Sequence, residues 1–81
     1  MSVYEKVRAY IEENGYKQMN VAKRAGIPYS TFNAILNGKR KLYADDLRAI
    51  CYALNVSPEK FIEIKYQSTY KEEWENEFWS F

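Results

Sequence analysis

The densest cluster of charged side chains in the sequence is basic and directly follows a glycine. Lys39, Arg40 and Lys41 come after Gly38. Three adjacent cations can neutralise a nucleic-acid backbone, because Lys and Arg are common partners of phosphate oxygens. A short charge run can also serve only to keep a surface soluble. We favour phosphate contact because the run comes directly after a predicted helix with a polar face.

That predicted helix carries small and polar residues on its outward face. At helical spacing, the face consists of Tyr29, Ser30, Asn33, Ala34 and Asn37. It contains no acidic residue that would repel phosphate. The amide of Asn33 can hydrogen-bond an adenine edge, and an α-helix fits the major groove of B-DNA. We therefore expect the first four of these residues to contact bases and the last to contact phosphate; the alternative is a plain solvent-exposed face.

Two short helical patterns that meet at Gly26 must position these residues. Their apolar stripes consist of Val21, Ala22 and Ala25 in the first pattern and Phe32, Ile35 and Leu36 in the second. A short turn containing Gly between two steeply angled helices is typical of the helix-turn-helix motif. Gly suits this turn because a positive φ costs a residue with a Cβ roughly 1–2 kcal/mol.

The remaining periodicity predicts three further helices. The first should span about 3–14, after a capping box formed by Ser2 and Glu5. Another should span about 44–54, and a short one about 58–62, after a Ser-Pro start signal. Gly15 and Asn55 are expected to be left-handed exits, and Phe61 should fill the core. These helices would hold the two central ones in place.

The residue types exclude most enzyme chemistry. The chain has no histidine and a single cysteine, Cys51, so Ser-His-Asp and Cys-His nucleophiles and the usual zinc sites cannot be built. Cys51 lies on an apolar helical face and is predicted to be a small buried hydrophobe. The adjacent acidic pairs, at 12–13 and 45–46, point in different directions on their helices. We expect no enzyme, no metal and no cofactor.

Length and charge indicate one small domain with an acidic extension. The chain has 81 residues, no long apolar run and no basic-then-apolar leader, so we expect a cytoplasmic protein. Residues 1–62 hold ten Lys and Arg against six Asp and Glu, a net charge of +4. Residues 63–81 hold two Lys against five Glu, a net charge of −3. The basic part is thus the part suited to nucleic acid.

The extension is rich in aromatic residues. Two Trp and two Phe fall in the last eight positions, which indicates a segment that docks. One helical stripe at a spacing of four is possible, through Tyr66, Tyr70, Trp74 and Phe78; residues 64–70 could instead form a strand. The segment could fold back onto its own domain. We favour a homodimer, because one such domain reads few base pairs whereas a dimer reads two half-sites about 34–36 Å apart.

The stretch 18–42 closely resembles the helix-turn-helix of Cro/CI-type repressors of phages and bacteria, the XRE family. The resemblance covers about 4–63 and rests on Gln18, Ala22, Gly26, Ser30, Thr31, Ile35, Gly38, Lys39, Arg40, Leu47, Ile50, Ala53, Leu54, Val56, Ser57 and Phe61. It implies an all-α, five-helix, lambda-repressor-like DNA-binding domain over 1–63, followed by a C-terminal extension over 64–81.

The resemblance also implies a role for Gln18, since the matching Gln of these repressors hydrogen-bonds a DNA phosphate. A helix N-terminus favours an anion on physical grounds too. The chain departs from the family at two helix starts, with Lys17 where Ser or Thr is usual and Pro28 where Ser is frequent.

We therefore expect sequence-specific binding of double-stranded DNA by a transcriptional regulator, a repressor, that inserts its second central helix in the major groove. The alternative is an antitoxin or protein-interaction module of the same fold, whose C-terminal segment binds a partner protein.

Overall fold

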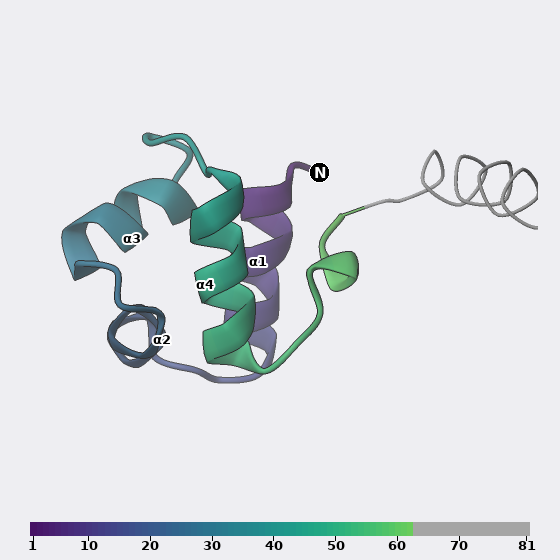
Figure 1. The fold of residues 1–81 in the computed structure, drawn as a ribbon, viewed down its shortest axis with the longest axis horizontal. Helices are drawn as coiled ribbons and strands as arrows, with labels where there is room; N and C mark the ends of the chain where they lie inside the picture. The colour runs from purple at the N-terminus through teal and green to yellow at the C-terminus, as the bar shows by residue number, and fades with distance from the viewer. Residues whose placement is uncertain (63–81) are drawn as a thin grey trace, which may run out of the picture.

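The computed structural model describes residues 1–62, which form four α-helices and one short 3-10 helix and contain no strand (Figure 1). In chain order these are α1 (Val3–Glu13), α2 (Gln18–Ala25), α3 (Tyr29–Leu36), α4 (Ala44–Leu54) and the 3-10 helix η1 (Pro58–Lys60). The alternatives of a helical stripe or a strand after residue 63 lie outside the described residues. The all-helical architecture expected from the sequence is confirmed for the described part of the chain.

The helices begin and end where short-range signals place them. The capping box is present at the start of α1, where the Glu5 carboxylate accepts hydrogen bonds from the Ser2 hydroxyl at 2.7 Å and from its backbone N–H at 3.1 Å. α4 has the predicted bounds, and Asn55 exits it in the left-handed region with φ 58°. Lys17 precedes α2 in an extended conformation, without a side-chain capping bond.

The fifth predicted helix is shorter and tighter than expected. Instead of an α-helix over 58–62, η1 is a three-residue 3-10 helix in which the Lys60 and Phe61 N–H groups donate to carbonyls three residues earlier. A segment this short gains too few hydrogen bonds to offset the cost of nucleating an α-helix. Phe61 is nevertheless buried, as predicted, with 2% of its surface exposed.

The core lies where the four α-helices converge. Its fully buried side chains include Val7, Ile11, Phe32, Ile35, Leu36 and Ile50, and no polar side chain is buried among the described residues. Ala22 is buried on α2, which packs against both α3 and α4. The small side chain permits this close packing.

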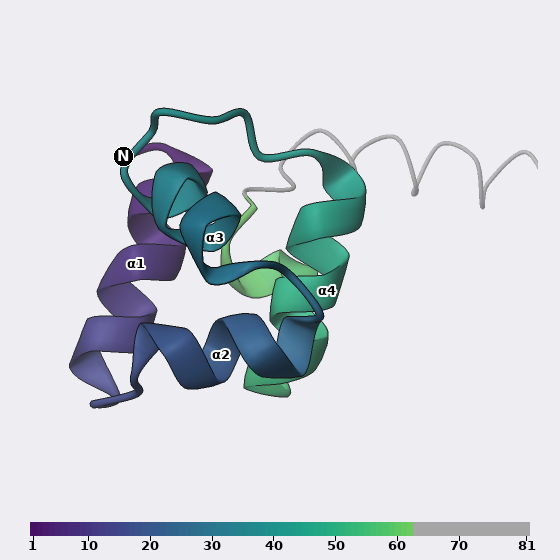
Figure 2. The same ribbon diagram turned by 90° about the vertical axis from the view of Figure 1, so that its left-hand side faces the viewer.

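α2 and α3 form one side of the domain. In Figure 1, α1 and α4 stand beside them at the centre of the view, and η1 lies on the opposite side from α3. Figure 2 views the domain from the α2–α3 side and shows α2 lying crosswise below α3. The fold therefore presents the two central helices together and leaves the end of the described chain remote from α3.

Candidate nucleic-acid interface

The turn between α2 and α3 is closed by backbone hydrogen bonds around Gly26. Gly26 adopts φ 71° and ψ 25°, the left-handed conformation predicted for it. The Ile27 N–H donates to the Ala22 carbonyl at 3.0 Å, the long-range bond of a Schellman cap. Pro28 then caps α3, and its carbonyl accepts from the Phe32 N–H at 2.9 Å. Pro is compatible with this place because it has no N–H that would remain unpaired.

α3 exposes the polar face that the sequence predicts. Tyr29, with 45% of its surface exposed, and Ser30 stand free at the first turn, while Asn33 and Ala34 are half-buried one turn further on. The opposite face of the helix is buried in the core. The exposed start of α3 is therefore the part of this helix most accessible to a large ligand.

A hydrogen-bonded row of amides joins α2 to α3. The Asn33 side-chain N–H₂ lies 3.4 Å from Oε1 of Gln18, the first residue of α2, to which it donates. The Asn37 amide nitrogen donates in turn to Asn33, at 2.8 Å to its carbonyl and 3.2 Å to its Oδ1. Sequence reasoning proposed a role for each residue separately and missed this coupling. The bond holds the Asn33 amide in a fixed orientation.

The backbone and side-chain N–H groups of Asn37 are both engaged in these contacts. Its backbone N–H donates to the Asn33 carbonyl at 3.1 Å, and its side-chain nitrogen donates to the same carbonyl and to the Asn33 Oδ1. A phosphate contact from Asn37, as expected from the sequence, would need one of these bonds to break. Its Oδ1 accepts no bond from the described residues, but a carbonyl-type oxygen cannot donate to phosphate.

The basic loop closes the C-terminal end of α3. The backbone N–H groups of Lys39 and Arg40 both donate to the Ala34 carbonyl, at 2.9 and 3.2 Å. The three cationic side chains of the loop are exposed. Lys41 Nζ lies 5.5 Å from the centroid of the Tyr43 ring, within the range of a cation–π contact. The cations thus stand on an ordered loop at the opposite end of α3 from Tyr29.

Two side chains of α1 contact the chain where α3 passes into the basic loop. The sequence does not predict either contact. The Arg8 guanidinium donates to the Leu36 carbonyl at 3.3 Å. Tyr4 packs against Gly38, so closely that a Cβ added there would lie 2.6 Å from its hydroxyl oxygen. These contacts join residues distant in sequence, so no local spacing signals them. They fix where α3 ends and where the basic loop begins.

The charged side chains of α2, α3 and the basic loop are all positive. Residues 15–44 contain six Lys and Arg and no Asp or Glu. The acidic residues of 1–62 all lie on α1, α4 and η1, where Asp45 pairs with Arg48 at 3.7 Å. A carboxylate facing a phosphate backbone would repel it, so the α2–α3 side is the side of the domain suited to a polyanion. The acid-free stretch extends beyond the polar face of α3 to the whole of α2 and the basic loop.

The described residues offer no sign of other site chemistry. Within 1–62 no three His, Cys, Asp or Glu side chains come close enough to hold a metal ion. Cys51 is buried, and burial raises the pKa of its thiol, in agreement with the predicted role as a small hydrophobe. In the same part of the chain, no helix has the length and hydropathy needed to cross a bilayer.

Two helices joined by a left-handed glycine, with an exposed polar second helix and an acid-free basic surface, define a helix-turn-helix nucleic-acid-binding domain. The family model of the Cro/C1-type HTH DNA-binding domain matches residues 6–67, and the chain belongs to this family. Membership makes it a DNA-binding domain of a transcription regulator, with double-stranded DNA as its partner. No curated protein matches the chain, and no solved structure does.

Proposed function

We propose that the protein recognises a specific duplex sequence with α3 in the major groove and represses transcription by occupying that site. The observation that carries this proposal is the Asn33 amide, held by Gln18 on the exposed side of α3. Asn is suited to bidentate hydrogen bonding with adenine, and a fixed amide has little orientational freedom to lose when it binds. Tyr29 and Ser30 precede it at the end of α3 that enters the groove, and the methyl group of Ala34 can meet a thymine methyl.

The proposed phosphate contacts flank this helix. Gln18 lies at the start of α2, where free N–H groups and the helix dipole favour an anion. Lys39, Arg40 and Lys41 lie beyond the other end of α3. Contacts on both sides would fix the register of the helix, and base contacts between them would supply specificity. In this arrangement Gln18 contributes to both register and specificity, since it binds the DNA backbone and orients the Asn33 amide.

Selection from a pool of random duplexes tests this function directly, because it returns the preferred site and its symmetry together. On that site, Asn33→Ala should weaken binding by about 1–3 kcal/mol, with a much smaller loss on random DNA. Asn14→Ala is the control, since this exposed Asn follows α1 and lies outside the proposed contacts. Equal losses on specific and random DNA would contradict base recognition by Asn33.

Repression requires its own test. A reporter promoter that contains the selected site should lose transcription when the protein is expressed, and a promoter with a scrambled site should not. Increased transcription from the intact site would make the protein an activator and contradict this part of the proposal.

We also propose that two copies act together as a homodimer through residues 64–81. The argument is that one domain contacts only a few base pairs, whereas a two-fold dimer reads two half-sites on one face of the duplex. The aromatic content of this segment suits an interface core. A selected site with two inverted half-sites would support the dimer.

A further inference from the structure

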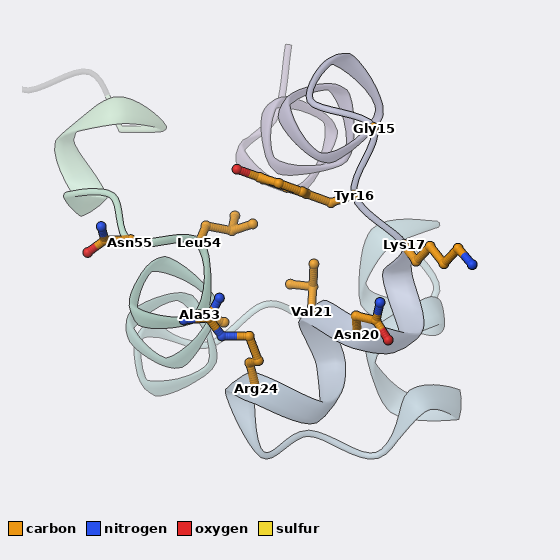
Figure 3. Close-up of a pocket in the computed structure, with 9 residues that line it drawn as sticks. All are labelled: Gly15, Tyr16, Lys17, Asn20, Val21, Arg24, Ala53, Leu54 and Asn55. Atoms are coloured by element: carbon orange, nitrogen blue, oxygen red, sulfur yellow. The ribbon is translucent and has the colours of Figure 1, made fainter.

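A cavity opens at the end of the domain where the α1–α2 turn meets the C-terminus of α4. Its volume is about 420 Å³. Figure 3 shows the Tyr16 ring lying over Leu54, with Val21 pointing toward the same space from α2. Arg24 stands at its edge, whereas Lys17 borders the cavity but directs its side chain away from the other lining residues. The cavity thus combines an apolar wall with a cationic side chain at its edge, and its volume is in the range of ligand-binding pockets.

The cations at this cavity have no acidic partner among residues 1–62. In that part of the chain the ion pair formed is Arg48 with Asp45, on α4. Arg24 also borders two neighbouring hollows, next to Lys23 and the exposed Tyr52. The result is a basic and partly aromatic surface centred on Arg24, which has the charge to attract an acidic ligand.

Residues 72–79 of the same sequence have the complementary composition. Four Glu surround Trp74, Phe78 and Trp79 in this stretch. The aromatic rings match the apolar wall in character, and the carboxylates match the cation at its edge. Complementary charge favours the correct pairing over others and speeds encounter.

The described part of the chain ends close to the cavity, so residues 72–79 begin within a short distance of it along the chain. Phe61 lies 5.7 Å from the Tyr10 ring, and Tyr10 lies 6.4 Å from the Tyr16 ring that covers the cavity, centroid to centroid. The stretch from Ile62 to Trp74 spans up to roughly 40 Å when extended. A segment of this length is long enough to pass beyond the cavity of its own domain.

We infer that the cavity beside Arg24 binds residues 72–79 of a second copy of the chain, and that reciprocal exchange of these segments forms the dimer. The inference rests on the proposed homodimer, because that proposal is what requires two domains to be held together. Reciprocal exchange gives a closed two-fold interface in which each copy donates one segment and accepts one. It leaves α3 of both copies free, since the cavity lies between α2 and α4.

The test uses the full chain without DNA, so its result is independent of operator recognition. Both tryptophans of the sequence, Trp74 and Trp79, lie in the exchanged segment, so tryptophan fluorescence reports on this segment alone. Sedimentation of the wild type should show a dimer. Its tryptophan emission should shift to longer wavelength on dilution, over the same concentrations at which the dimer dissociates.

Arg24→Glu should raise the dimer dissociation constant about tenfold or more, since it sets like charges against each other. Lys6→Glu is the matched control: it makes the same charge change on α1, and Lys6 lines neither the cavity nor the hollows around Arg24. The replacement of both Trp74 and Trp79 by Ala should also dissociate the dimer, and it leaves residues 1–62 intact.

Four results would overturn the inference. A dimer that withstands Arg24→Glu would place the interface elsewhere. A monomeric wild type whose emission is independent of concentration but red-shifted by Arg24→Glu would mean that the segment occupies its own cavity. Equal effects of Lys6→Glu and Arg24→Glu on the dissociation constant would mean that the dimer responds to net charge alone. A monomer that still selects a single half-site would remove the dimer while leaving DNA recognition standing.

Discussion

Gln18 and Asn33 illustrate what single residues reveal before and after the fold is known. Each was a candidate by type and position, Gln18 at a helix start and Asn33 on a polar helix face. Their hydrogen bond could not be predicted, because it depends on the angle between α2 and α3. Arg8 and Tyr4 gave no local signal at all, since their partners lie at the far end of α3.

Gly38→Ala should disturb both stability and DNA binding. Gly38 and Gly15 have nearly the same backbone, with φ 71° and 68°, so an added Cβ costs each about 1–2 kcal/mol of strain. At Gly38 the Cβ would also collide with Tyr4, whereas at Gly15 nothing lies within 4 Å. Urea unfolding should therefore show a larger loss for Gly38→Ala than for Gly15→Ala.

DNA affinity should fall for Gly38→Ala because the shifted chain moves the basic loop. Adding Tyr4→Ala to Gly38→Ala should remove part of the excess cost, as expected for residues in contact. Equal unfolding free energies for the two single variants would mean that the Tyr4 contact does not constrain this turn.

Arg40→Ala should weaken binding to every DNA sequence alike. Loss of one phosphate contact releases one fewer counterion, so the slope of log K against log[salt] should become shallower by roughly 1. Gln18→Ala should also weaken binding, but with little change in slope, because Gln carries no charge. Arg48→Ala is the control, since Arg48 pairs with Asp45 on α4. An unchanged slope with lost sequence preference would assign Arg40 to base recognition instead.

At the scale of elements, the helix boundaries were largely predictable because their signals are local. Gly26 and Asn55 take the left-handed exits expected of them, and α4 spans the predicted residues. The short last helix was the exception. The sequence predicts its start, from Ser57 to Pro58, correctly. Whether the helix then has three or five residues depends on packing around Phe61.

The cap of α1 should make stability depend on acid pH. Hydrogen bonds from the Ser2 hydroxyl and then from the Ser2 backbone N–H hold the pKa of the Glu5 carboxyl below its ordinary value of 4.5. A lowered pKa means that the charged form stabilises the folded state. This contribution is present above pH 4.5 and is lost as the pH falls through the lowered pKa.

Thermal unfolding of Glu5→Gln should therefore show a lower Tm than the wild type at neutral pH, and the difference should vanish in acid. Ser2→Ala should reproduce the effect in weaker form, because the backbone N–H bond survives. A Tm difference that is independent of pH would show that the side chain acts through its shape and not its charge.

At the scale of the whole molecule, the segregation of charge was the most informative feature of the sequence. Composition placed a net charge of +4 in residues 1–62 and −3 in residues 63–81. The structure shows where the positive charge of residues 1–62 is concentrated. The acid-free stretch of residues 15–44 forms α2, α3 and the basic loop, which lie on one side of the domain. The sequence alone does not show that these residues lie on one side of the domain, because that depends on how α2 and α3 pack against the other helices.

This one-sided distribution has a kinetic consequence. Six of the ten cations of residues 1–62 lie in the acid-free stretch, whereas all the carboxylates lie on other elements. The field of a duplex should therefore rotate this domain before the two molecules touch. If α3 enters the groove as proposed, a larger fraction of collisions should begin with α3 toward the DNA, and the association rate should exceed that of an evenly charged domain of equal net charge. The same attraction acts on any sequence, so we expect the protein to slide along non-specific DNA before it reaches its site.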